Sequence, residues 1–265
     1  MTSERKIRIG VQLQPQHADY AEIRDAVRRA EDLGVDIAFN WDHFYPLTGD
    51  PDGKHFECWT TLAAWAEQTS RVQIGALVSC NSYRNPQLLA DMARTVDHIS
   101  GGRVILGIGS GWFEKDYDEY GYDFKTAGKR LDDLRDSLPQ IKDRIARLNP
   151  APIGDIPVLI GGNGEKKTLR LVAEYADIWH TSTSGELLDH KLSVLAGHCA
   201  DVGRELGEIE VSSEVAGPGK PRLAPEEGQA LLEQGVTLFT VAVSGPDYDL
   251  SRVEEYVAWR DALNG

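Results

Sequence analysis

The chain has 265 residues, 41% of them hydrophobic, which suits either two small domains or one large barrel with a full core. Its formal net charge of -14 argues against nucleic acid and against an anionic membrane surface as partners, because both attract clustered Lys and Arg. Three cysteines without metal-ligand spacing predict ordinary thiols in a reducing cytoplasm and no metal site.

Short β-rich runs alternate with longer amphipathic runs along the whole chain. We expect eight strand–helix pairs. The expected strands are 6–13, 35–40, 71–79, 103–109, 158–162, 176–180, 209–215 and 236–243. The helices expected to follow them in turn are 19–34, 59–70, 85–100, 126–148, 165–175, 186–205, 225–234 and 250–262. Pro139 is expected to interrupt or kink the helix over 126–148. No segment supplies the ~18–20 consecutive apolar residues of a membrane span, and the charged start "MTSERKIRIG" does not resemble a signal peptide.

Eight strand–helix pairs without an intervening linker predict a (β/α)8 TIM barrel that forms one domain over residues 1–265. A doubly wound parallel sheet is the alternative, because a repeated strand–helix pattern alone does not exclude it. In a barrel the chemistry lies in the loops after the carboxyl ends of the strands. Those loops therefore define the candidate site residues.

The loop after the second strand contains "NWDHFYP", with Asp42 and His43 side by side. Histidine has a pKa close to neutrality, and an adjacent carboxylate can orient its ring, so this pair is a candidate for proton transfer. The alternative is an aspartate that caps a turn beside a surface histidine. The position of the pair at a strand end favours the functional interpretation.

The end of the fourth strand and the loop after it contain Gly107, Gly109 and Gly111 in alternation, which allows close approach of another backbone or of a flat ligand. The acidic run that follows, 114–121, could supply a catalytic carboxylate, for which Glu114 is the candidate. A solvated loop is the simpler interpretation of that run.

The loop after the fifth strand, "LIGGNGEKKTLRL", is rich in glycine and leads into a helix. Backbone N–H groups at a helix start attract anions, so this loop predicts a phosphate site, with a plain helix start as the alternative. Lys166, Lys167 and Arg170 could add positive charge or could lie on a solvated face.

Three blocks together resemble the bacterial-luciferase-like superfamily, in its branch of F420-dependent oxidoreductases. The blocks are "DHFYP", the run from "WTTLAAWAEQTSRVQIGALVSCNSYRNP" through "RVILGIGSGWFEKDYDEYGYDF", and "IPVLIGGNGEKKTLRLVAEYADIW", and they cover roughly residues 5–180 in order. The resemblance implies a TIM barrel that binds a flavin or 5-deazaflavin at the carboxyl ends of its strands. It also implies a homodimer.

The resemblance also assigns roles to individual residues. Asp42 and His43 would lie beside the tricyclic ring, with His43 handling a proton and Asp42 holding it. A non-proline cis peptide is implied at Leu77–Val78, behind the ring. Further residues implied to bind the cofactor are Leu77, Val78, Ser79, Ser110, Gly111 and Trp112 around the ring and Gly161, Gly162, Asn163 and Gly164 at its phosphate.

The resulting hypothesis is an oxidoreductase that moves a hydride between coenzyme F420 and an organic small-molecule substrate. An aromatic wall suggests that the substrate is flat or apolar: Trp41, Phe44, Tyr45, Trp112 and Phe113. Trp112 stands where the sugar-phosphate dehydrogenase branch carries a carboxylate, so no sugar phosphate is expected and reduction of the substrate is favoured. The segment 216–228 is short where relatives often carry insertions, which predicts an open mouth. An FMN-dependent monooxygenase and a non-catalytic cofactor-binding protein are the alternatives.

Overall fold

A computed structural model describes residues 5–217 and 223–265. Within them, strands paired in parallel form one sheet in the order β3-β2-β1-β9-β8-β7-β6-β5-β4, and an additional pairing of β3 with β5 closes it into a barrel. The fold is therefore the predicted (β/α)8 TIM barrel. The strands are β1 (Arg8–Gln14), β2 (Ile37–Asn40), β3 (Gln73–Ala76), β4 (Ser79–Cys80), β5 (Val104–Gly109), β6 (Val158–Gly161), β7 (Ile178–Thr181), β8 (Glu210–Ala216) and β9 (Val236–Ser244).

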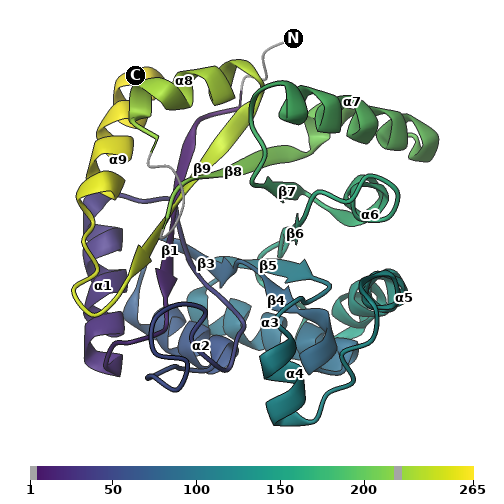
Figure 1. Cartoon of the computed structure of the whole chain (residues 1–265), viewed down its shortest axis with the longest axis horizontal. Coiled ribbons are helices and arrows are strands. Elements are labelled where there is room, and N and C mark those ends of the chain that lie inside the picture. Colours follow the sequence, from purple (N-terminus) through teal and green to yellow (C-terminus); the bar gives the residue numbers. More distant parts are fainter. Residues whose placement is uncertain (1–4, 218–222) are drawn as a thin grey trace.

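The helices surround the barrel on its outside (Figure 1). They are α1 (Tyr20–Leu33), α2 (Cys58–Gln68), α3 (Pro86–Ser100), α4 (Glu114–Tyr120), α5 (Ala127–Arg147), α6 (Thr168–Tyr175), α7 (Gly185–Val202), α8 (Pro225–Glu233) and α9 (Ser251–Asn264). Local signals explain their ends. Asn85 caps the start of α3 with Pro86 in its first turn, and Gly34 and Gly101 end α1 and α3 in the left-handed conformation.

Two apolar cores hold the barrel together. Inside it, alternate strand residues meet in one cluster, which consists of Ile37, Phe39, Ile105, Leu159, Ile178 and Leu238. The larger cluster lies between the outer faces of the strands and the helices. Strand β5 is buried along its whole length, as expected for a parallel strand covered on both faces.

The structure differs from the expected elements at four places. The strand expected over 71–79 is split into β3 and β4 by the Leu77–Val78 peptide, which is cis as the resemblance implied. The acidic run after β5 forms helix α4 rather than a loop. Helix α5 continues through Pro139. Helix α6 begins at Thr168, after a turn over 165–167.

Two further expectations concern parts of the chain that are only partly described. Within residues 5–217 and 223–265, no helix combines the length and the apolar character needed to cross a membrane. Of the segment 216–228, residues 218–222 lie outside the described residues.

Candidate active site

A pocket of about 220 Å³ opens at the carboxyl ends of β2, β4 and β5, where a TIM barrel carries its chemistry. It gathers the catalytic and cofactor-binding residues predicted in the loops after β2, β3 and β5, except Ser110. Of the predicted aromatic wall it includes Trp41 and Trp112, whereas Phe44, Tyr45 and Phe113 lie outside its lining. The predicted loop Gly161–Gly164 lies outside its lining. The lining consists of Gln12, Trp41, Asp42, His43, Leu47, Leu77, Val78, Ser79, Cys80, Tyr83, Gly111 and Trp112.

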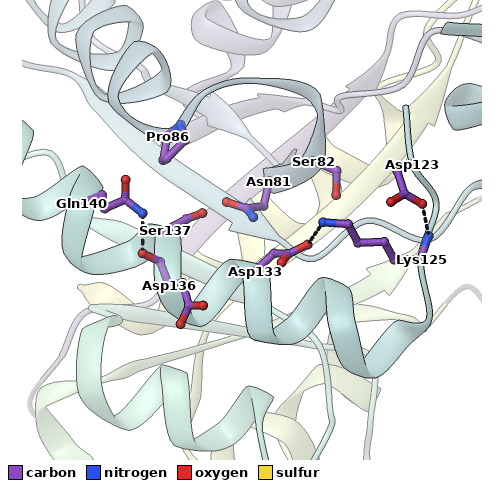
Figure 2. A pocket seen from close by; sticks show the side chains of 9 residues that line it. All are labelled: Asn81, Ser82, Pro86, Asp123, Lys125, Asp133, Asp136, Ser137 and Gln140. Carbon is purple, nitrogen blue, oxygen red and sulfur yellow. Dashed lines mark hydrogen bonds and ion pairs between the residues drawn. The ribbon is translucent and has the colours of Figure 1, made fainter. Parts of the chain in front are cut away.

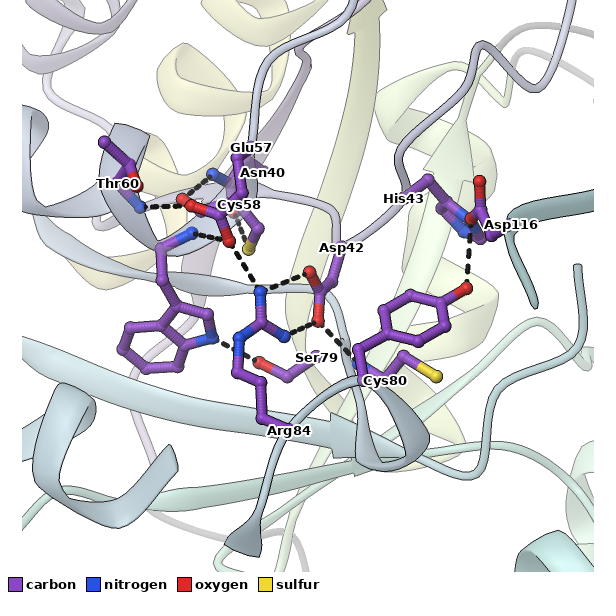
Figure 3. A network of polar contacts seen from close by, with 12 residues as sticks. Asn40, Asp42, His43, Glu57, Cys58, Thr60, Ser79, Cys80, Arg84 and Asp116 are labelled. Carbon is purple, nitrogen blue, oxygen red and sulfur yellow. Dashed lines mark hydrogen bonds and ion pairs between the residues drawn. The ribbon is translucent and has the colours of Figure 1, made fainter. Parts of the chain in front are cut away.

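Asp42 is buried, and Arg84 binds its carboxylate (Figure 3). The guanidinium donates to both carboxylate oxygens, at 2.5 Å from Nη1 and 2.9 Å from Nη2, and the backbone N–H of Cys80 donates at 2.9 Å. Arg84 also pairs with Glu57, whose carboxylate caps the start of α2. The expectation that Asp42 holds His43 is therefore wrong, because Arg84 and the backbone N–H of Cys80 occupy both oxygens of the Asp42 carboxylate.

His43 is held instead by Asp116 of α4, whose side chain is fully buried. Nδ1 of His43 lies 2.7 Å from Oδ2 of Asp116, and the Tyr83 hydroxyl donates to the same oxygen at 3.0 Å. The backbone N–H groups of Phe44 and Tyr45 each donate to Oδ1 at 3.1 Å. Because a carboxylate accepts hydrogen bonds, Nδ1 carries the hydrogen, and Nε2 is the nitrogen left for a molecule in the pocket.

The acidic run folds as a short helix with Glu114 and Asp116 in its first turn, where the helix dipole favours negative charge, and it ends at Gly121 in the left-handed conformation. Asp116 and Tyr117 form its buried side, whereas Tyr120 is 55% exposed. Glu114 is exposed, as the solvated interpretation predicts, whereas Asp116 of the same run is buried and binds His43. The acidic start followed by Gly121 is the signal that could have identified α4.

Aromatic rings form the walls of the pocket. Trp112 is 62% exposed, and its ring meets that of His43 edge to face with centroids 5.7 Å apart. Trp41 is buried and its indole N–H donates to Nε2 of His55 at 2.9 Å. Burial lowers the pKa of His55 to about 4, in agreement with an unprotonated, accepting nitrogen. His55 is thus neutral near pH 7.

The floor of the pocket is formed by Leu77 and Val78, which pack on the inner barrel cluster. Gln12 fixes the floor by donating from its side-chain amide to the carbonyl of Leu77 at 2.8 Å. A Cβ at Gly107 would lie 1.9 Å from the carbonyl oxygen of Ala76, and one at Gly109 would lie 2.8 Å from Val78. These glycines therefore permit close approach of neighbouring protein atoms.

Two predicted cofactor-binding residues, Ser79 and Ser110, have surroundings that limit what their side chains can do. The Ser79 hydroxyl accepts a hydrogen bond from the indole of Trp59 at 3.1 Å, so this side chain is directed toward α2. Ser110 precedes Gly111, which has φ +81° and leaves no room for a Cβ beside the hydroxyl of Tyr117. The turn after β5 thus requires glycine at 111.

The glycine-rich loop after β6 adjoins the floor. A Cβ at Gly161 would lie 3.3 Å from Val78, and Gly162 adopts φ +124°. Asn163 is held in place by Thr181, whose hydroxyl donates to its side-chain oxygen at 2.6 Å. Of the basic residues that follow, Lys167 pairs with Asp132.

The sequence reasoning missed Arg84, Tyr83 and Gln12 as well as Asp116. Arg84 and Tyr83 are separated from their carboxylate partners by tens of positions in the sequence. No local pattern marks such residues, since only the closure of the barrel brings their strand ends together.

Relatives with known sequences match parts of the chain. An uncharacterised protein of Mycobacterium tuberculosis is 28% identical over 184 residues, which are 61% of this chain and 64% of that protein. An F420-dependent glucose-6-phosphate dehydrogenase of Amycolatopsis mediterranei is 32% identical over 56% of this chain and 48% of its own length. A putative coenzyme F420-dependent oxidoreductase of M. tuberculosis is 30% identical over 66% of this chain and 55% of its own length. The chain thus spans about half to two thirds of the length of these relatives.

Solved structures share the fold along almost the whole chain. An F420-dependent secondary alcohol dehydrogenase in complex with an F420-acetone adduct superposes with a TM-score of 0.82 at 16% identity, covering 96% of this chain and 98% of the other. The oxygenating constituent of 3,6-diketocamphane monooxygenase from Pseudomonas putida, in complex with FMN, gives a TM-score of 0.71 at 15% identity over 96% and 97%. At these identities the likeness concerns the fold alone.

The family model for luciferase-like monooxygenases matches residues 6–216, which include every predicted site residue and the pocket they line. The chain therefore belongs to the luciferase-like monooxygenase family.

Proposed function

We propose that the protein is an oxidoreductase that transfers a hydride between coenzyme F420 and a flat or apolar organic substrate. The observation that carries this proposal is His43, which is bound through Nδ1 by the buried Asp116 and lines the pocket with Nε2 available. Such a histidine can exchange one proton with a substrate oxygen while a hydride moves at the neighbouring carbon. The relatives named for F420 support the choice of cofactor.

The residues of the pocket fit an uncharged, flat ring. Leu77 and Val78 offer an apolar floor, and Trp41 and Trp112 offer aromatic walls. The charge of Asp42 is balanced by Arg84, so this carboxylate does not repel a ring placed over the floor. In this proposal Ser79 and Gly111 complete the ring site, and Ser110, which lies outside the pocket lining, leads the chain into Gly111.

The phosphate of the cofactor would be held by the loop Gly161–Gly164. The loop follows β6, adjoins the floor through Gly161 and leads into α6, whose amino-terminal end favours an anion. Lys167 is engaged with Asp132 of α5, and Arg170 is engaged with Glu174 and Asp201. We therefore propose that the backbone of this loop, rather than Lys167 or Arg170, binds the phosphate.

When bound, F420 supplies or accepts the hydride; the protein supplies orientation, a dry surface and the proton. With Nδ1–H donated to Asp116, neutral His43 accepts a proton at Nε2 if the substrate is an alcohol. The protonated ring donates from Nε2 if the substrate is a carbonyl. Trp112 in place of a carboxylate favours the second direction. We place the reaction in the cytoplasm, a reducing compartment that suits three buried free thiols.

The proposal is tested by titrating the protein with F420 and, separately, with FMN while following fluorescence quenching. We expect saturable quenching of F420 and weaker or no binding of FMN. Tight FMN binding without F420 binding would instead support the monooxygenase, an alternative that the fold of the diketocamphane enzyme keeps open.

The variant His43→Gln separates an enzyme from a protein that only binds the cofactor. We expect it to bind F420 within a few-fold of the unmodified chain and to lose hydride transfer in a screen of carbonyl acceptors. If the unmodified chain binds F420 but leaves every acceptor unreduced, and every alcohol unoxidised, the non-catalytic alternative is favoured.

A further inference from the structure

A second polar pocket, of about 430 Å³, shares the short helix η1 (Asn81–Tyr83) with the candidate active site but none of its lining residues. Figure 2 shows Asn81, Ser82 and Pro86 facing residues of α5, with Asp123 and Lys125 at one end. We call it the η1 pocket. It is lined by Asn81, Ser82, Pro86, Asp123, Lys125, Asp133, Asp136, Ser137 and Gln140.

The η1 pocket carries a negative charge. Three aspartates and one lysine line it, which leaves a formal charge of two negative, on a chain whose own net charge is -14. Anions such as phosphate are therefore repelled. Apart from Pro86, the other lining side chains are amides and hydroxyls, so the pocket presents an excess of hydrogen-bond acceptors to a visiting molecule.

Asn81 is an independent sign that a donor is missing. The residue is only 8% exposed, and its side-chain oxygen is buried without any hydrogen-bond partner. Buried polar atoms are almost always hydrogen-bonded, so an orphaned acceptor in the wall of a pocket points to a ligand that donates.

Lys125 shows which chemistry the pocket accepts. Its ammonium lies 2.7 Å from a carboxylate oxygen of Asp133, inside the pocket lining. Asp136 and Gln140 lie toward the other end of the row from Lys125 (Figure 2), so acceptors are spread along the length of the pocket. One oxygen of the Asp136 carboxylate accepts from the neighbouring Arg135 at 2.9 Å. A metal ion fits poorly, because no group of three or more metal-ligating side chains exists among the residues that the structure describes.

From these observations we propose that the η1 pocket is a binding site for a linear organic cation that carries N–H donors, of the diamine or polyamine class. One ammonium group donates to Asn81, and another pairs with Asp136 at the far end. This site is independent of the proposed redox reaction, and its ligand is not the substrate.

The test is isothermal titration of the full-length protein with spermidine at low and at physiological salt. We expect one saturable site. Asn81→Leu, which has a similar volume, should weaken binding by about tenfold, because it removes a hydrogen bond to a charged group. Asp136→Asn should weaken it by about threefold, as for a partly exposed ion pair.

Asp143→Asn is the matched control, because Asp143 is an equally exposed aspartate of α5 that lies outside the pocket and pairs with Arg147. Equal weakening by Asp143→Asn and Asp136→Asn would show that spermidine only neutralises the acidic chain, and would overturn the proposal. Absence of saturable binding to the unmodified protein would overturn it as well. The redox proposal is unaffected by either result, because F420 binding is measured separately.

Discussion

At the scale of single residues, the adjacent Asp42 and His43 belong to two separate networks. Asp42 joins Arg84 and Glu57 and so ties the end of β2 to η1 and α2. His43 joins Asp116 and so ties the same loop to α4. The first network balances a buried charge, and the second fixes an imidazole ring. One dipeptide therefore supplies a structural anchor and a candidate proton carrier.

Replacing Asp116 with Asn should disturb the tautomer of His43, because an amide can also donate to the ring and no longer requires a hydrogen on Nδ1. In nitrogen-15 spectra of histidine-labelled protein, His43 should be the Nδ1–H form in the unmodified chain and a mixture in Asp116→Asn. Turnover should fall by about 10²- to 10⁴-fold, the range for lost acid–base catalysis.

Asp118→Asn serves as the control for this substitution, since Asp118 is exposed on the same helix. It should leave the His43 signals and turnover unchanged. If Asp116→Asn also left the signals unchanged, Asp116 would not set the tautomer.

His55 should make the stability of the fold depend on acid. Its pKa is lowered by burial to about 4 from an ordinary value of 6.5, so between these values the unfolded chain binds a proton that the folded chain does not. The contribution to the free energy of unfolding is complete above pH 6.5 and decreases by about 3 kcal/mol as the pH falls to 4.

Urea unfolding of the unmodified chain and of His55→Gln, measured from pH 7 to 4, checks this expectation. Glutamine keeps an acceptor for the Trp41 indole but does not titrate. The stability of the unmodified chain should therefore fall more steeply than that of the variant. Parallel curves would contradict the assignment of a neutral, half-buried His55.

At the scale of elements, the site depends on how closely β5 approaches β3. A Cβ on Gly107 would lie 1.9 Å from the backbone oxygen of Ala76, an atom that cannot move without shifting the strand. The same approach brings Val78 against Gly109 and so positions the floor of the pocket. Alternating glycines in this strand serve the packing of the barrel.

Gly107→Ala should therefore destabilise the fold by about 3 kcal/mol or more, the upper range for overpacking of a core. Gly197→Ala is the matched change, because Gly197 lies within α7 with open space where its Cβ would be. That variant should stabilise the protein by about 0.5–1 kcal/mol through helix propensity. Thermal unfolding of both variants measures these changes in stability. An unchanged stability in Gly107→Ala would contradict the close approach of β5 to β3.

At the scale of the whole molecule, closure of the barrel places distant loops around one opening. The loops after β2, β4 and β5 form the pocket, and the loop after β6 adjoins it through Gly161 and Val78. The η1 pocket lies next to this assembly because α5 packs against η1. Two candidate sites thus share one short helix.

We expect the protein to be a homodimer, as the family resemblance implies. Light scattering coupled to gel filtration should give a single species at about twice the chain mass of 29.3 kDa. A species at the mass of one chain would contradict this expectation.

Much of this architecture follows from the sequence itself. The hydrophobic periodicity determined eight strand–helix pairs, because each strand must be apolar on faces covered by other elements. Residues at the strand ends, such as His43 and Trp112, could be placed at the mouth of the barrel for the same reason. The family blocks added the cis peptide at Leu77–Val78, which the structure contains.

Tertiary structure alone decided which charges meet. Asp42 pairs with Arg84, and His43 pairs with Asp116, across sequence separations of 42 and 73 residues. Periodicity reports which side of an element is buried, but not which buried polar groups become neighbours when strand ends converge. The partners of a buried charge depend on the directions of side chains from several loops, and only the closed barrel fixes those directions.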